Sequence, residues 1–131
     1  MTKESKLMNE RIAQSPLATY TAHLQRGALA YQYDKERDHA VFFPRVIPEN
    51  GSVEWRVSQG RGTVYSSTVV FPRGAAPYNV ALIDLDEGFR MMSRVECPDP
   101  MQVTIGQRVS ARIVRAEGEE LPLVVFDRVD A

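Results

Sequence analysis

A glycine-flanked arginine opens directly into a run of β-branched residues, and this segment constrains the fold more than any other. The run follows Gly60-Arg61-Gly62 and reads TVYSSTVV over residues 63–70, a composition enriched in strands. The two glycines permit a sharp turn at the strand entrance and the close approach of another group. Alternation assigns Thr63, Tyr65 and Ser67 to one face and Val64, Ser66, Thr68 and Val70 to the other. The first face is polar enough to meet a ligand; alternatively, the glycines only form a bulge in a barrel strand.

Strand patterns recur along the second half of the chain. Glycine and proline signals at residues 60–62, 72–74, 86–88, 98–100 and 117–118 mark the turns between them. Six strands are predicted, at residues 54–58, 63–71, 78–85, 89–95, 108–115 and 121–129. Five or six short antiparallel strands with Greek-key connections are typical of an OB-fold barrel. The chain is therefore predicted to be mainly β, with a barrel over residues 54–131.

The N-terminal part, residues 1–28, is predicted to be a polar leader followed by a short amphipathic helix. Leu17, Tyr20 and Leu24 recur at helical spacing, and Gly27 is a natural C-terminal stop. The first residues contain no apolar core of a signal peptide and no membrane span. We therefore expect a cytoplasmic protein that does not enter a membrane.

Composition and motifs disfavour several functional classes. Sixteen basic residues balance seventeen acidic ones, for a formal net charge of −1, so a general polyanion binder is not expected. The single cysteine, Cys97, excludes an intrachain disulfide. The two histidines, His23 and His39, lie outside the predicted barrel, and no nucleophile motif, P-loop or dinucleotide fingerprint is present. The sequence thus predicts a protein without catalytic activity of its own.

Three segments resemble the DUF35 family of acyl-CoA-associated OB-fold proteins. They are GRGTVYS at residues 60–66, VALIDLDEG at 80–88 and IGQRV at 105–109. Their order and spacing carry the resemblance, which extends from about Leu24 onward. It implies an OB-fold barrel preceded by a rubredoxin-like zinc ribbon.

The chain departs from the family in that ribbon, predicted over residues 29–53. Counting from the segment Phe42-Phe43-Pro44-Arg45, the family's cysteine positions fall on Asp34, Arg37, Pro48 and Gly51. A structural zinc site needs four suitable ligands, so we expect a degenerate ribbon without zinc. Such a small segment must be held by apolar burial instead. The side chains expected to supply it are Tyr31, Val41, Phe42, Phe43, Val46 and Trp55.

The resemblance implies an accessory subunit that binds acyl-CoA and associates with a thiolase-like or ketoacyl-synthase-like enzyme. Phosphates favour arginine and backbone amides, and a pantetheine arm suits a groove of small groups. The residues expected to bind acyl-CoA are Arg61, Gly62, Thr63, Tyr65 and Ser66, with Arg45 or Arg73 near the phosphates. An exposed apolar patch on the helix and the ribbon is expected to dock the partner.

Two other functions stay open. The barrel could be a module that binds single-stranded nucleic acid, although the aromatic residues lack the dense basic interleaving typical of such modules. It could also have a purely structural role and hold the subunits of a larger enzyme together. Self-association into a homo-oligomer is a further possibility.

Overall fold

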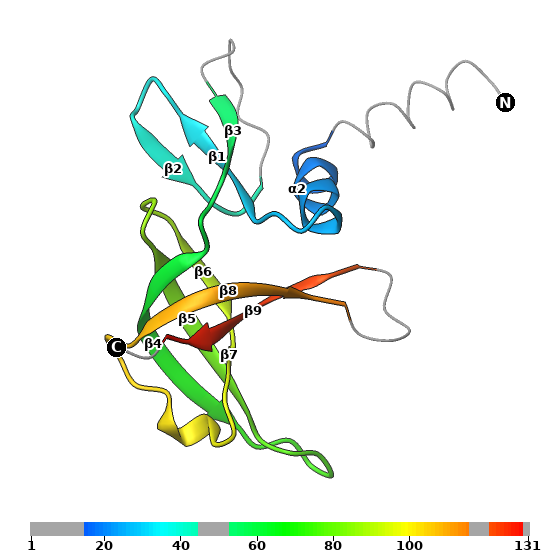
Figure 1. The fold of residues 1–131 in the computed structure, drawn as a ribbon, viewed down its shortest axis with the longest axis vertical. Helices are drawn as coiled ribbons and strands as arrows, with labels where there is room; N and C mark the ends of the chain where they lie inside the picture. Colours follow the sequence, from blue (N-terminus) through cyan, green and yellow to red (C-terminus); the bar gives the residue numbers. More distant parts are fainter. Residues whose placement is uncertain (1–14, 45–52, 116–120, 130–131) are drawn as a thin grey trace, which may run out of the picture.

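Two β-sheets carry the fold in the computed structural model, which describes residues 15–44, 53–115 and 121–129. The smaller sheet has the order β2-β1-β3, with β1 at Ala30–Asp34, β2 at His39–Val41 and β3 at Val53–Val57. The larger sheet has the order β6-β5-β4-β8-β9-β7. Its strands are β4 (Arg61–Val70), β5 (Tyr78–Leu85), β6 (Arg90–Ser93), β7 (Val95–Glu96), β8 (Arg108–Val114) and β9 (Leu123–Arg128). Figure 1 shows the smaller sheet above one end of the larger one.

The larger sheet closes into a barrel. Strands β6 and β7 stand at opposite ends of the strand order but are separated in sequence only by Arg94. Arg94 thus joins the two edges through the chain, and its carbonyl accepts the backbone N–H of Phe126 in β9 at 2.9 Å. The predicted strand 89–95 is thus one bent strand that pairs with β5 and then with β9. The expected mainly β, OB-fold architecture is confirmed.

Strand β3 lies in the smaller sheet rather than in the barrel. The sequence placed residues 54–58 in the barrel, yet β3 pairs antiparallel with β1 along its whole length, from Ala30 opposite Val57 to Asp34 opposite Val53. The composition of β3 suits either sheet, and its pairing depends on the strand that lies beside it, β1. The division of the chain at residues 28 and 53 stays a prediction.

A β-bulge at Tyr65 corrects the expected alternation along β4. Val64 is opposite Ile83 and Ser66 is opposite Leu82, so Tyr65 is the extra residue. Val64 faces the core, whereas Tyr65 and Ser66 both face outward. Ser67, which is opposite the buried Ala81, therefore points inward instead of sharing a face with Thr63 and Tyr65.

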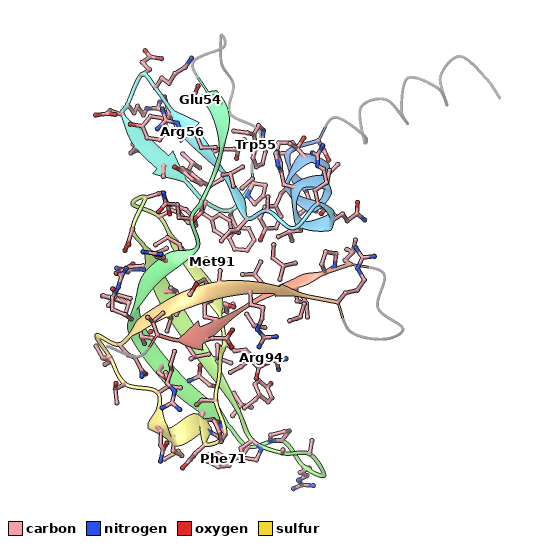
Figure 2. The ribbon with its side chains drawn as sticks, in the orientation of Figure 1. Glu54, Trp55, Arg56, Phe71, Met91 and Arg94 are labelled. Atoms are coloured by element: carbon pink, nitrogen blue, oxygen red, sulfur yellow. The ribbon has the colours of Figure 1, made fainter. Side chains whose placement is uncertain are left out.

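The predicted helix is present as α2 (Pro16–Gln25). The Ser15 hydroxyl accepts the N–H of Ala18 at its start, and Gly27 follows its end with φ +84°. Most of its apolar face is used within the chain: Tyr20 packs edge-on against Phe42, Leu24 is buried, and His23 stacks on Trp55. Figure 2 shows Trp55 beside α2. Only Leu17, 63% exposed, is left from the predicted docking patch on the helix.

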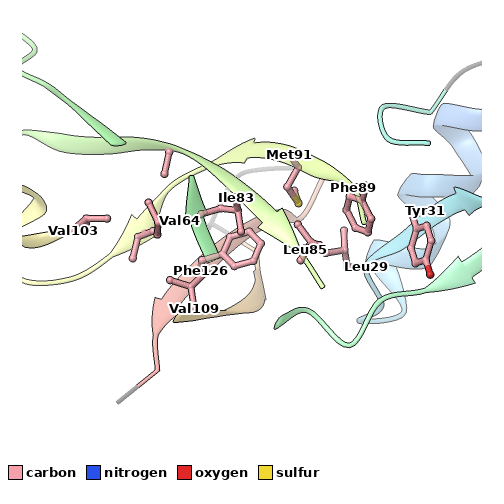
Figure 3. Close-up of a cluster of buried hydrophobic side chains, with 12 residues drawn as sticks. Leu29, Tyr31, Val64, Ile83, Leu85, Phe89, Met91, Val103, Val109 and Phe126 are labelled. Carbon is pink, nitrogen blue, oxygen red and sulfur yellow. The ribbon is translucent and has the colours of Figure 1, made fainter. Parts of the chain in front are cut away.

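The hydrophobic core is continuous from the smaller sheet into the barrel (Figure 3). Phe89, in the β5–β6 turn, lies 4.8 Å from the ring centre of Tyr31 and 4.9 Å from that of Phe42. Apolar burial thus holds the ribbon segment, as expected. Phe43 is 71% exposed and contributes little burial, although its ring centre lies 5.9 Å from that of Phe42; Val46 lies outside the described residues.

Candidate ligand-binding site

The entrance of β4 is fixed to the β5–β6 turn by hydrogen bonds through Glu87. Its carboxylate accepts the Ser58 hydroxyl at 2.7 Å and the N–H of Gln59 at 2.9 Å. The Ser58 oxygen in turn accepts the N–H of Gly60 at 2.8 Å. The backbone that carries Arg61 is therefore held in place, which a binding surface requires.

The two glycines beside Arg61 make room for the protein's own strands. A Cβ on Gly62 would lie 2.6 Å from the carbonyl oxygen of Asp84 in β5. Gly60 has φ +77°, and its Cβ would lie 3.0 Å from the Cβ of Ala111 in β8. The space that the sequence assigned to an approaching group is thus occupied by β5 and β8. Gly62 is buried, so its side of the strand is closed to a ligand.

A groove of about 930 Å³ lies on the other side of Arg61. Its wall is the turn before β8, which Val64 holds against β4: the Val64 N–H donates to the carbonyl of Gln107, and its carbonyl accepts the N–H of Gly106. The groove is lined by Arg61, residues 104–110 and Val129. Sequence reasoning did not assign this turn to the site, although the exposed Ile105 beside Gly106 is a signal of it.

Arg61 and Arg108 line this groove with the same charge but differ in their ion pairing. Arg108 forms a bidentate ion pair with Asp86 at 2.8 and 2.7 Å and also donates to the Thr63 hydroxyl. The hydrogen bonds from Arg108 lower the pKa of Asp86, and the nearby charge of Arg61 adds to the effect. Arg61 is exposed and forms no ion pair with any residue that the structure describes. It is therefore the cation at this groove with free capacity for an anion.

The remaining predicted residues lie away from the groove. Tyr65 and Ser66 face outward further along β4, and the guanidinium of Arg90 lies 3.5 Å from the ring centre of Tyr65. Arg73 is in the β4–β5 turn, beyond the end of β4 that is opposite Arg61; β4 itself spans about 30 Å at the usual rise per strand residue. Figure 2 places the nearby Phe71 at the barrel end opposite the smaller sheet. Arg45 lies outside the described residues.

Other candidate chemistry is sparse in the part of the chain that the structure describes. No group of three or more His, Cys, Asp or Glu side chains there could hold a metal ion. The half-buried Cys97 donates its thiol to the carbonyl of Asp99 at 3.0 Å. None of the helices among these residues is long and apolar enough to cross a membrane.

Known proteins resemble this chain in sequence and in fold. A family model for the C-terminal OB-fold domain of ChsH2 matches residues 55–114. A DUF35 domain-containing scaffold protein of Methanothermobacter thermautotrophicus is 38% identical over 92 residues, which cover 61% of this chain and 69% of the relative. The alpha subunit of a 3-oxo-4,17-pregnadiene-20-carboxyl-CoA hydratase of Mycobacterium tuberculosis is 37% identical over 79 residues, 57% of this chain. The matched region spans only 24% of that relative's length.

The fold comparison covers more of the chain. A solved structure described as an Ltp2-ChsH2(DUF35) aldolase matches with a TM-score of 0.71 and 28% identity. The match covers 85% of this chain and 92% of that one. The similarity therefore extends over more of the chain than the barrel alone.

Proposed function

Because this chain belongs to the DUF35 family of OB-fold proteins, we propose that it is a non-catalytic accessory subunit of an acyl-CoA enzyme. The fold match to the Ltp2-ChsH2(DUF35) aldolase carries this proposal, because the name of that aldolase joins a DUF35 protein to a second protein, Ltp2. The partner of the present chain is a thiolase-like or ketoacyl-synthase-like subunit, and the complex functions in the cytoplasm.

The proposed ligand is acyl-CoA, with a phosphate bound at Arg61. An arginine without an ion pair among the described residues, on a backbone fixed by Glu87, is suited to a charge-assisted contact with a phosphate. The groove beside it has apolar walls at Ile105 and Val129. Thr63, whose hydroxyl accepts a hydrogen bond from Arg108, offers a polar contact beside this groove, whereas Tyr65 and Ser66 lie beyond it on the outer face of β4.

Charge pairing argues against the nucleic-acid alternative. On the outer face of the barrel, Arg90 pairs with Asp84, Arg108 with Asp86 and Arg112 with Asp127, each at 2.6–2.8 Å. These pairs neutralise the arginines that a single strand would need as a positive groove. The same face suits a ligand that brings only a few charges.

Titration calorimetry with acetyl-CoA, on the chain alone and with its enzyme partner, tests the proposal. Arg61→Ala removes a contact of about 1.5–3 kcal/mol and should weaken binding by about ten- to a hundredfold. Arg73→Ala is the matched control, since Arg73 is also exposed and unpaired among the described residues but lies at the far end of β4.

The binding loss of the control variant and the enzymatic activity of the isolated chain complete the test. Equal losses in the two variants would mean that Arg61 has no specific role, and salt-dependent oligonucleotide binding without an acetyl-CoA response would favour the nucleic-acid function. The purified chain should show no hydrolase, transferase or thiolysis turnover. Turnover that its own mutations abolish would refute the accessory role.

A further inference from the structure

The turn between β1 and β2 is built around a buried carboxylate. Asp34, the last residue of β1, is only 2% exposed. One of its oxygens accepts the N–H groups of Glu36 and Arg37 at 3.0 and 3.1 Å, and the other accepts the Arg37 guanidinium at 3.2 Å. The carboxylate thus organises the backbone and meets its counter-ion within four residues.

The positions of Asp34 and Arg37 are those at which the family resemblance places the first pair of zinc-binding cysteines. The residues present do not fit a metal. Arg37 is a cation and cannot be a ligand, and both oxygens of Asp34 are already engaged. The other two positions are occupied by Pro48 and Gly51, which have no ligating side chain.

We propose that the Asp34–Arg37 ion pair replaces the zinc ion as the element that fixes this turn. In a zinc site a thiolate carries negative charge that the metal balances. Here the carboxylate carries the charge, the two backbone N–H groups bind it, and the guanidinium balances it. Replacing the metal site by this ion pair keeps the turn compact with one negative and one positive group.

A second carboxylate supports the same turn from its other end. Asp38 has φ +54° and accepts a hydrogen bond from the Tyr33 hydroxyl. The guanidinium of Arg56 in β3 covers the Tyr33 ring at 3.6 Å and pairs with Glu54. Side chains of β1, the turn and β3 therefore form a continuous polar network, where a zinc ribbon would depend on its metal.

Two variants of the full chain and one control test the proposal. Asp34→Asn keeps the shape but removes the charge, and should lower the midpoint of thermal unfolding by about 5–10 °C. It should also speed hydrogen exchange of the Glu36 and Arg37 amides by about tenfold or more. Glu36→Gln, at an exposed carboxylate in the same turn, should change neither quantity.

The second variant keeps the test decisive if Asp34→Asn does not fold. Arg37→Ala removes a side chain that is 70% exposed, so the core is untouched, and it should still lower the midpoint and speed exchange at the same two amides. Elemental analysis of the unmutated protein should find no stoichiometric zinc, and a chelator should leave the midpoint unchanged. One zinc per chain, or variants as stable and as protected as Glu36→Gln, would overturn the proposal.

Discussion

Substituting Gly62 by alanine separates two explanations of the glycine-flanked arginine. In the structure the added methyl would lie 2.6 Å from the Asp84 carbonyl oxygen and 2.8 Å from the Ile83 side chain. The first of these is backbone of β5, next to the position where Gly62 pairs with Leu85, and it cannot move without disturbing the β4–β5 pairing. If ligand access were the reason for the glycine, the unliganded protein would tolerate the methyl.

The expected cost is that of forced overpacking, about 3 kcal/mol. Unfolding entropy of about 2 cal/mol/K per residue, over 131 residues, converts this cost to a fall of about 10 °C in the unfolding midpoint. Differential scanning calorimetry of the unliganded protein measures this directly. Chemical denaturation at 25 °C should give the same order of destabilisation.

Gly74→Ala is the matched control. Gly74 has φ +75°, but nothing lies within 4 Å of its added Cβ, so the cost is conformational only, about 1–2 kcal/mol. Gly62 has no positive φ, and conformational preference alone would rank the two variants in the opposite order. A Gly62→Ala protein with an unchanged midpoint and weakened acetyl-CoA binding would refute the packing argument in favour of ligand access.

Two further predictions concern the aromatic contacts that join the smaller sheet to the barrel. Phe89→Ala removes the ring against which Tyr31 and Phe42 pack, and should cost about 3–5 kcal/mol in denaturant unfolding; a loss below about 1 kcal/mol would mean that the contact is not part of the core. Burial raises the pKa of Tyr20 from 10.0 to about 12. Because Tyr20 then ionises at lower pH in the unfolded chain than in the folded one, its contribution to the free energy of unfolding should be fully present below pH 10 and decline between pH 10 and 12. Ultraviolet titration of the protein against a Tyr20→Phe variant measures this pKa, and a value of 10 would contradict the burial.

The sequence predicted the fold where local pattern and long-range pairing agree. Strand β5 was predicted and found at residues 78–85, because a continuous apolar run at residues 80–83 lies between clear turn signals on both sides. The pairing of β3 was missed because its five residues would suit either sheet. The bulge at Tyr65 has no compositional signal, since it follows from the fit of β4 to β5 rather than from the residue itself.

The candidate site was predicted in part. Arg61 was identified from its place between two glycines, and the structure leaves it exposed beside a groove. The opposite wall, at residues 104–110, comes from a segment more than forty positions later in the chain, and only the folded barrel brings it there. Arg73 was grouped with Arg61 because phosphates favour arginine, but Arg61 begins β4 whereas Arg73 lies in the turn after its other end.

The continuous core limits how the two parts of this chain can evolve. A ribbon held by its own metal is a self-contained module that recombination can add to or remove from other proteins. Here the smaller sheet shares Tyr31 and Phe42 with Phe89 of the barrel, so neither part keeps a complete interior when the other is removed. Change must therefore proceed by matched substitutions on both sides of this contact, and the two parts are expected to evolve together.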